Sequence, residues 1–133
     1  MYQVAPQHAH RVGIIDDDDA VRDAIHVLLE TRGFQVSEYG SAQDYLRGPQ
    51  DDCILLVDLA MSELGGLDLA EILRTGGVET PIILMTDVPR PGQAQRISAA
   101  FRCTALPKPV DSRSLLATIA SCVCEMACSR TNA

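Results

Sequence analysis

The chain has 133 residues, of which 47% are hydrophobic and 22% are charged. These values fit one globular domain with a single hydrophobic core, and they exclude disordered and fibrous proteins. Eighteen acidic and eleven basic residues give a formal net charge of −7. Because an acidic surface repels nucleic acid, we expect no direct binding of DNA or RNA by this chain.

No segment has the length of a membrane span. The longest uninterrupted aliphatic stretches, Ile54–Val57 and Ile82–Met85, are far shorter than the roughly 20 apolar residues of a transmembrane helix. The first residues, Met1–Arg11, are polar and lack the apolar stretch of a signal peptide. We therefore expect a cytoplasmic protein that does not interact with membranes.

The cysteines indicate reduced thiols, because their number is odd and no two form a C-x-x-C pair. Zinc binding by Cys122, Cys124 and Cys128 is disfavoured, since Cys122 and Cys124 would point to different sides of a helix. We expect the thiols to pack as small hydrophobic groups at Cys53, Cys103, Cys122, Cys124 and Cys128.

In the first half of the chain, apolar runs alternate with segments of helical periodicity. The run at 12–15 predicts a strand that ends in four aspartates. Apolar residues recur at helical spacing over 20–32, and Gly33 provides the stop. Residues 34–37 alternate like a half-buried strand, and a Ser-x-x-Asp pattern opens a short helix over 41–46.

In the second half, the apolar runs at 53–57 and 81–85 are continuous, as expected for strands covered on both faces. Helical spacing from Leu67 stops at the Gly76–Gly77 pair. The remaining expected elements are a weak helix over 93–100, a short strand over 103–106, and a last helix over 111–126 that Asp111 caps.

These elements repeat a strand–helix unit five times. The repeat predicts a doubly wound α/β fold with a central parallel sheet of five strands and helices on both faces. We expect one domain over residues 11–128, a flexible N-terminal tail at 1–10 and a C-terminal tail at 129–133. In such folds, ligands bind outside the carboxyl ends of the strands.

Reactive side chains stand at four of these predicted strand ends, namely Asp16 and Asp17, Asp58, Thr86, and Lys108. Clustered carboxylates repel one another unless a cation lies among them, and oxygen ligands suit Mg²⁺ or Mn²⁺. The lysine and the threonine would offer a positive charge and a hydrogen bond to a phosphoryl group. An aspartate can itself be the nucleophile and become an acyl phosphate.

Other interpretations of the acidic run are weaker. Alone, Asp16–Asp19 would be a solvated loop that caps a helix. An EF-hand is excluded because the sixth position of a loop starting at Asp16 is Val21 rather than glycine. The sequence also lacks G-x-G-x-x-G and Walker A motifs, so nucleotide binding of those kinds is not expected.

Motifs at the strand ends carry a resemblance to a known family. They are IIDDDDAVR at 14–22, LVDLAM at 56–61 followed by GL at 66–67, ILMT at 83–86, and LPKP at 106–109. Over about residues 10–128, the sequence resembles the receiver domain of two-component response regulators. The resemblance implies a flavodoxin-like (βα)5 fold.

The resemblance implies that Asp58 is the phosphoacceptor, which takes phosphate from a sensor histidine kinase or a phosphotransfer protein. Thr86 would then bond the phosphoryl group, Lys108 would pair with it, and Lys108–Pro109 would be a cis peptide bond. It implies a signalling domain that is not an enzyme, apart from catalysis of its own phosphotransfer and dephosphorylation. A homodimer is compatible with the resemblance.

The resemblance also implies a metal site. Asp17, Asp58 and the backbone carbonyl of Ala60 would bind Mg²⁺ directly, while Asp16 would act through water. The metal would neutralise charge during an in-line transfer of the phosphoryl group.

The sequence departs from the family pattern at several positions. Ala105 stands where an aromatic residue usually reads out phosphorylation, and Asp87 stands where the residue after the threonine is normally small. Ser62 replaces a proline four residues after the phosphoacceptor, which relaxes that loop. Two prolines within 88–92 and Phe101, where a glycine is common, predict a short or displaced fourth helix.

Two alternative functions follow from these residues. A receiver-like module that binds partners without phosphotransfer is favoured by Asp87 and Ala105, but opposed by the intact acidic, threonine and lysine positions. A phosphatase of the haloacid-dehalogenase type needs a second aspartate two residues after the first, where this chain has Ala60. The cognate kinase, the output and the choice between a freestanding protein and part of a longer regulator stay open.

Several other residues are expected to be solvent-exposed or to pack in the core, without a role in the site. His26 is expected to be solvated, because it falls on the opposite side of its helix from Leu28. Met61 is expected to pack under the loop after Asp58. Tyr39 and Tyr45 are expected to be part of the core, with exposure of Tyr45 left open.

Overall fold

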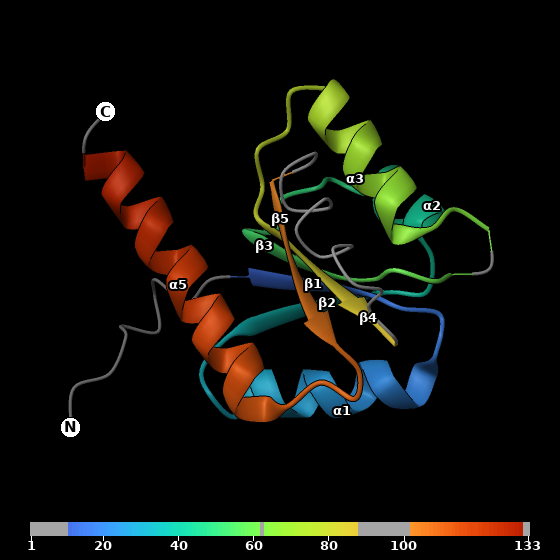
Figure 1. Ribbon diagram of the computed structural model, residues 1–133, viewed down its shortest axis with the longest axis horizontal. Helices are drawn as coiled ribbons and strands as arrows, with labels where there is room; N and C mark the ends of the chain where they lie inside the picture. The colour runs from blue at the N-terminus through green and yellow to red at the C-terminus, as the bar shows by residue number, and fades with distance from the viewer. Residues whose placement is uncertain (1–10, 62, 88–101, 132–133) are drawn as a thin grey trace.

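The structure, a computed structural model, describes residues 11–61, 63–87 and 102–131, with the side chains of the last helix described to Val123. These residues form a five-stranded parallel sheet between two helical layers, which confirms the predicted fold class (Figure 1). The strands are β1 (Arg11–Ile15), β2 (Gln35–Tyr39), β3 (Ile54–Asp58), β4 (Ile82–Thr86) and β5 (Cys103–Pro107). The helices are α1 (Asp19–Glu30), α2 (Ala42–Arg47), α3 (Gly66–Thr75) and α5 (Ser112–Thr131).

The strand order β2-β1-β3-β4-β5 puts β3 at the centre of the sheet. The apolar run of β3 is continuous because both of its faces are covered. Leu55 and Val57 pack in the layer of α2 and α3, whereas Ile54 and Leu56 pack in the layer of α1 and α5. The chain crosses from one layer to the other between β1 and β3, so the topological switch point lies between these strands.

Element boundaries differ from the predicted ones by a few residues. The strand expected at 34–37 is β2, at 35–39, whereas α5 begins directly after Asp111, its predicted cap. Helix α5 also continues to Thr131, so the C-terminal tail expected at 129–133 begins inside the helix. The helix expected over 93–100 and the tail at 1–10 lie outside the described residues.

The expected helix caps are present. Ser41 Oγ accepts a hydrogen bond from the Asp44 amide at 3.1 Å, and Asp111 Oδ2 accepts one from the Ser114 amide at 2.9 Å. Caps of this kind stabilise a helix start by about 1 kcal/mol. The local sequence therefore agrees with the fold where these helices begin.

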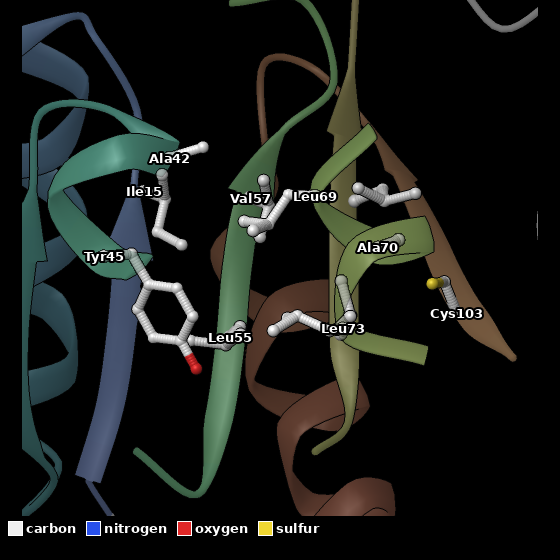
Figure 2. Close-up of a cluster of buried hydrophobic side chains, with 11 residues drawn as sticks. Ile15, Ala42, Tyr45, Leu55, Val57, Leu69, Ala70, Leu73 and Cys103 are labelled. Carbon is white, nitrogen blue, oxygen red and sulfur yellow. The ribbon is translucent and has the colours of Figure 1, made fainter. Parts of the chain in front are cut away.

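A polar cluster that the sequence patterns do not predict is buried between α2 and the sheet. Tyr45 is fully buried, so it belongs to the core, and its ring meets that of Tyr39 edge-on with centroids 5.2 Å apart. Figure 2 shows Tyr45 between Ile15 and Leu55. The Tyr39 hydroxyl donates to Asp52 Oδ2 at 2.8 Å.

This cluster also explains a glycine in β1. A Cβ atom at Gly13 would lie 2.9 Å from Asp52 Oδ2, closer than real Cβ contacts allow. Within the described residues, Asp52 Oδ1 and the Tyr45 hydroxyl have no hydrogen-bond partner. Asp52 is therefore a buried carboxylate just before β3, and among the described residues its one hydrogen bond comes from Tyr39.

The described cysteines agree with the expectation of thiols. Cys103 and Cys122 are buried, Cys53 is half-buried, and none of the three forms a disulfide. Burial raises the pKa of the Cys103 thiol. Among the described helices, none combines the length and the apolar character that crossing a bilayer requires.

Candidate functional site

The predicted site residues come together at one edge of the sheet. Asp58 is the last residue of β3 and Thr86 is the last residue of β4, while Asp16 and Lys108 directly follow β1 and β5. Because the strands are parallel and adjacent, their carboxyl ends lie side by side. The convergence expected from the sequence is thus present in the fold.

Three carboxylates form the centre of this edge. One oxygen each of Asp16, Asp17 and Asp58 lie within 4.8 Å of one another. Asp16 is fully buried and Asp58 is 6% exposed, whereas Asp17 is exposed to solvent. Such close like charges are costly unless a cation offsets them.

The two buried carboxylates share Lys108. Its Nζ lies 3.4 Å from Asp16 Oδ2 and 3.4 Å from Asp58 Oδ1. Burial alone would lower the pKa of Lys108, but the two carboxylates outweigh it and raise the pKa above its ordinary value. The side chain is only 16% exposed, so the ammonium is largely enclosed between the two carboxylates.

Asp58 has the environment of a reactive carboxylate. Its Oδ1 accepts a hydrogen bond from the Ala60 amide at 3.2 Å in addition to the contact with Lys108. Burial, followed by the charge of Asp16, raises the pKa of Asp58, while Lys108 opposes the shift. Within the described residues, these contacts are made through Oδ1, so Oδ2 is the oxygen available to an incoming group.

Asp16 uses both of its oxygens within the protein. Oδ1 accepts a hydrogen bond from the Asp18 amide at 2.9 Å, and Oδ2 is the oxygen paired with Lys108. Asp18 in turn caps α1 by accepting hydrogen bonds from the amides of Ala20 and Val21. The four aspartates after β1 therefore have different roles, and the solvated-loop interpretation does not describe Asp16.

Backbone hydrogen bonds tie the strand ends together. The amides of Leu59 and Lys108 donate to the carbonyls of Met85 and Thr86, at 2.8 and 2.7 Å. A Cβ atom at Gly66 would lie 2.7 Å from the Asp58 carbonyl, so only glycine lets α3 start so close to β3. The Lys108–Pro109 bond is cis, as the resemblance implies.

An open groove of about 640 Å³ leads to the site. Its polar lining includes Asp17, Asp58, Lys108 and the exposed Asp87, so Asp87 shares the groove with the site. Its apolar lining comes from α1 and from the segment after β5, and comprises Val21, Ala24, Ile25, Pro109 and Val110.

Other departures from the family pattern are only partly visible. Ala105 lies on β5 opposite Leu84 and is half-buried, so no ring occupies this place. Ser62, the prolines within 88–92 and Phe101 lie outside the described residues. Met61 is partly buried and packs against the core on the side of α2 and α3.

Sequence reasoning missed a charged cluster beside the acidic residues. His26 pairs with Glu38, and its Nε2 lies 3.4 Å from Glu30 Oε2, so the expectation that it is simply solvated is wrong. Arg22 also contacts Glu38, at 3.1 Å. The spacing of Arg22, His26 and Glu30 by four residues puts them on one helix face, which is the available sequence signal.

Comparisons with known proteins agree with this geometry. The response regulator receiver domain family matches residues 12–120. The transcriptional regulatory protein FixJ of Azorhizobium caulinodans is 35% identical over 113 residues, which cover 81% of this chain and 52% of FixJ. The response regulator MprA of Mycolicibacterium vanbaalenii is 31% identical over 112 residues, which cover 80% of this chain and 47% of MprA. The chain thus spans about half the length of these relatives.

Solved structures show the same fold. The receiver domain of the Francisella response regulator 1452 has a TM-score of 0.82 at 19% identity, covering 88% of this chain and 98% of that one. A CheY-like receiver domain protein from Methanospirillum hungatei has a TM-score of 0.78 at 25% identity, covering 91% and 98%. With the family match and the relatives above 30% identity, these likenesses lead to one conclusion: the chain belongs to the receiver domains of two-component response regulators.

Proposed function

We propose that Asp58 is the phosphoacceptor of this receiver, and that it takes the phosphoryl group from a phosphohistidine of a sensor histidine kinase or phosphotransfer protein. The observation that carries the proposal is the placement of Asp58. It is a buried carboxylate at the end of the central strand, 3.4 Å from a lysine and beside two further carboxylates. The cytoplasm, where such kinases present their phosphohistidine, is the proposed location.

The residues present fit a divalent cation. Asp16, Asp17 and Asp58 bring three negative charges together, and Lys108 supplies one positive charge within contact distance. The remaining negative charge and the hard oxygen donors suit Mg²⁺, or Mn²⁺. Asp17, Asp58 and the carbonyl of Ala60 would hold the ion directly, and Asp16 would hold it through water because both of its oxygens are engaged. When bound, the ion supplies charge neutralisation to the transferred phosphoryl group.

The transfer itself uses the chain's own groups. Oδ2 of Asp58 attacks the phosphorus atom, a bond between this oxygen and phosphorus forms, and the phosphorus–nitrogen bond breaks. The electron pair of the broken bond stays on the imidazole nitrogen, so the donor histidine leaves without an added reactant. Lys108 pairs with the phosphoryl oxygens and the Thr86 hydroxyl donates to one of them. Thr86 ends β4, the neighbour of β3, and Lys108 follows β5, one strand further along the sheet.

The output of the switch is proposed to lie outside this chain. FixJ is named a transcriptional regulatory protein, and this chain matches about half of it, whereas the chain itself is acidic. DNA binding would therefore belong to another domain or protein. Ala105 also implies that the response to phosphorylation does not use an inward-turning aromatic ring at this position.

A second candidate is an interaction module that works without phosphorylation. The observation that favours it is the position of Asp87, whose carboxylate lies in the groove that a phosphoryl group must enter. In that case the groove would bind a partner protein, and the acidic residues would be retained for the fold alone.

One experiment separates the two candidates. The protein is incubated with acetyl phosphate and Mg²⁺, and the acyl phosphate is detected by gel mobility. We expect labelling of the wild type and none of Asp58→Asn. Asp52→Asn is the matched control, since Asp52 is an equally buried aspartate outside the site, and it should be labelled like the wild type. A wild type without acyl phosphate would favour the interaction module.

A further inference from the structure

We propose that Arg22 is a positioning residue of the acidic site. Its guanidinium fixes the peptide that joins Asp16 to Asp17, and Glu38 in turn fixes the guanidinium. The inference rests on the proposed function, because it concerns how the turn that would hold the metal is kept in place.

Arg22 donates to three separate elements. Nη1 donates to the backbone carbonyl of Asp16 at 2.6 Å, Nη2 to Asp19 Oδ1 at 2.6 Å, and Nε to Glu38 Oε1 at 3.1 Å. The side chain is 15% exposed, so protein acceptors replace most of its water. A planar guanidinium can satisfy several acceptors in fixed directions, which a lysine ammonium cannot do. Arg22 thus links the turn after β1, the start of α1 and the edge strand β2.

The contact with the Asp16 carbonyl matters most for Asp17. This carbonyl belongs to the peptide plane between the two aspartates, so its direction sets where the main chain carries Asp17. Asp16 itself has other restraints: its amide donates to the Tyr39 carbonyl at 3.2 Å, and its carboxylate is engaged on both oxygens. Asp17 is exposed, and in the described part of the chain its carboxylate makes no hydrogen bond or ion pair. Its place therefore depends on the main chain that Arg22 holds.

Glu38 is held from both oxygens. Oε1 accepts from Arg22, and Oε2 pairs with Nδ1 of His26, which also faces Glu30. A carboxylate fixed in this way offers the guanidinium a defined acceptor rather than a freely rotating one. Contacts thus run without interruption from the surface of α1, through β2, to the turn that carries Asp17.

A positioning role and a purely electrostatic role of Arg22 predict opposite changes in Mg²⁺ affinity when the residue is replaced. By Coulomb attraction alone, removing a positive charge close to a cation site strengthens the binding of Mg²⁺. Loss of an outer residue that orients a ligand weakens metal binding instead, by about 10-fold or more. The sign of the change in Mg²⁺ affinity therefore distinguishes a positioning role from a purely electrostatic one.

The test is calorimetric titration of the metal-free protein with MgCl₂. We expect the dissociation constant of Mg²⁺ to rise about tenfold in Arg22→Gln. It should rise severalfold in Arg22→Lys, which keeps the positive charge but loses the planar set of guanidinium donors. Glu38→Gln should give a smaller rise. Arg47→Gln is the matched control, because Arg47 is 76% exposed and pairs only with Asp44 among the described residues. It loses the same charge and should bind Mg²⁺ as the wild type does.

The outcomes separate this inference from the proposed function. If the wild type binds no Mg²⁺, the proposed function fails. If the wild type binds and Arg22→Gln binds equally or more tightly, the positioning role is overturned, even when its thermal stability falls. If circular dichroism shows that Arg22→Gln is unfolded, Arg22→Lys decides: unchanged affinity overturns the inference, and weakened affinity supports it.

Discussion

Strand β3 has a buried aspartate near each end, and the fold treats the two in opposite ways. Asp52, just before the strand, is 5% exposed, and among the described residues it receives one hydrogen bond, from the Tyr39 hydroxyl. Asp58, the last residue, is 6% exposed and lies beside two carboxylates, a lysine and an open groove. Burial alone therefore does not identify a functional carboxylate. Its neighbours do, because the Asp58 end gathers three carboxylates within 4.8 Å of one another, at a cost in stability.

The same substitution at both ends should have effects of opposite sign on stability. Asp52→Ala removes the carboxylate to which the Tyr39 hydroxyl donates and should lower the free energy of unfolding by about 2 kcal/mol. Asp58→Ala should instead raise it without metal, because a raised carboxyl pKa means that folding disfavours the charged form. Urea unfolding with a chelator at neutral pH measures both. Two losses of similar size would contradict the comparison.

Mg²⁺ should be able to replace the positive charge that Lys108 supplies beside Asp58. Lys108→Met keeps the apolar stem but leaves Asp16 and Asp58 without their shared positive charge. We expect unfolding free energy to fall by about 2 kcal/mol without metal, somewhat less than for a fully buried pair. Saturating Mg²⁺ should recover most of the loss, since it adds charge to the same cluster. A loss that Mg²⁺ leaves unchanged would mean that the lysine acts through packing.

Asp87 adds a carboxylate to the groove beside Asp58, so it should repel anionic phosphodonors. At the high effective dielectric of a surface, the penalty is about 1 kcal/mol, or fivefold in rate. Asp87→Ala should speed labelling by acetyl phosphate by this factor, with a smaller gain at high salt. Asp87→Asn should give most of the gain. A gain with alanine alone would identify a steric obstacle, and no gain with either would remove Asp87 from the site.

Glu38 extends the comparison to a carboxylate near the surface with cationic partners. Its hydrogen bond with His26 raises the pKa of His26 and lowers that of Glu38. The His26 contribution is complete below its unfolded pKa, near 6.5, and is lost as pH rises through the folded value. The Glu38 contribution is lost as pH falls below the ordinary glutamate value of 4.5.

We expect a change of about 0.5 kcal/mol from this pair, because both side chains are partly exposed. Unfolding curves of the wild type and His26→Gln over about pH 6 to 9 measure it. The wild type should lose stability relative to the variant as pH rises. Parallel pH profiles would show that the pair contributes nothing to folding.

The sequence predicts those features that depend on strand periodicity and on chain direction. Parallel strands share one carboxyl edge, so Asp16, Asp58, Thr86 and Lys108 could be brought together before the structure was known. Burial of particular side chains follows from packing between distant elements. The enclosure of Lys108 and Tyr45 could not be predicted for this reason.

Contacts across elements are missed for the same physical reason. The Arg22–Glu38 pair joins residues 16 apart, on a helix and an edge strand, and no local period marks it. Asp52 likewise looks like an ordinary loop residue until Tyr39 and Gly13 are placed around it. Local patterns place elements and ends, whereas side-chain networks need three-dimensional distances.

Two backbone carbonyls at the end of β4 accept hydrogen bonds from the segments that follow β3 and β5. Leu59, which follows the phosphoacceptor, is bound to Met85, and Lys108 is bound to Thr86. These two hydrogen bonds connect the strand end to both neighbours, so a displacement of it would be transmitted to both. Such transmission makes no demand on the side chain at Ala105, where the family usually has an aromatic ring. Backbone coupling of this kind tolerates sequence drift, because any residue other than proline supplies the same amide hydrogen.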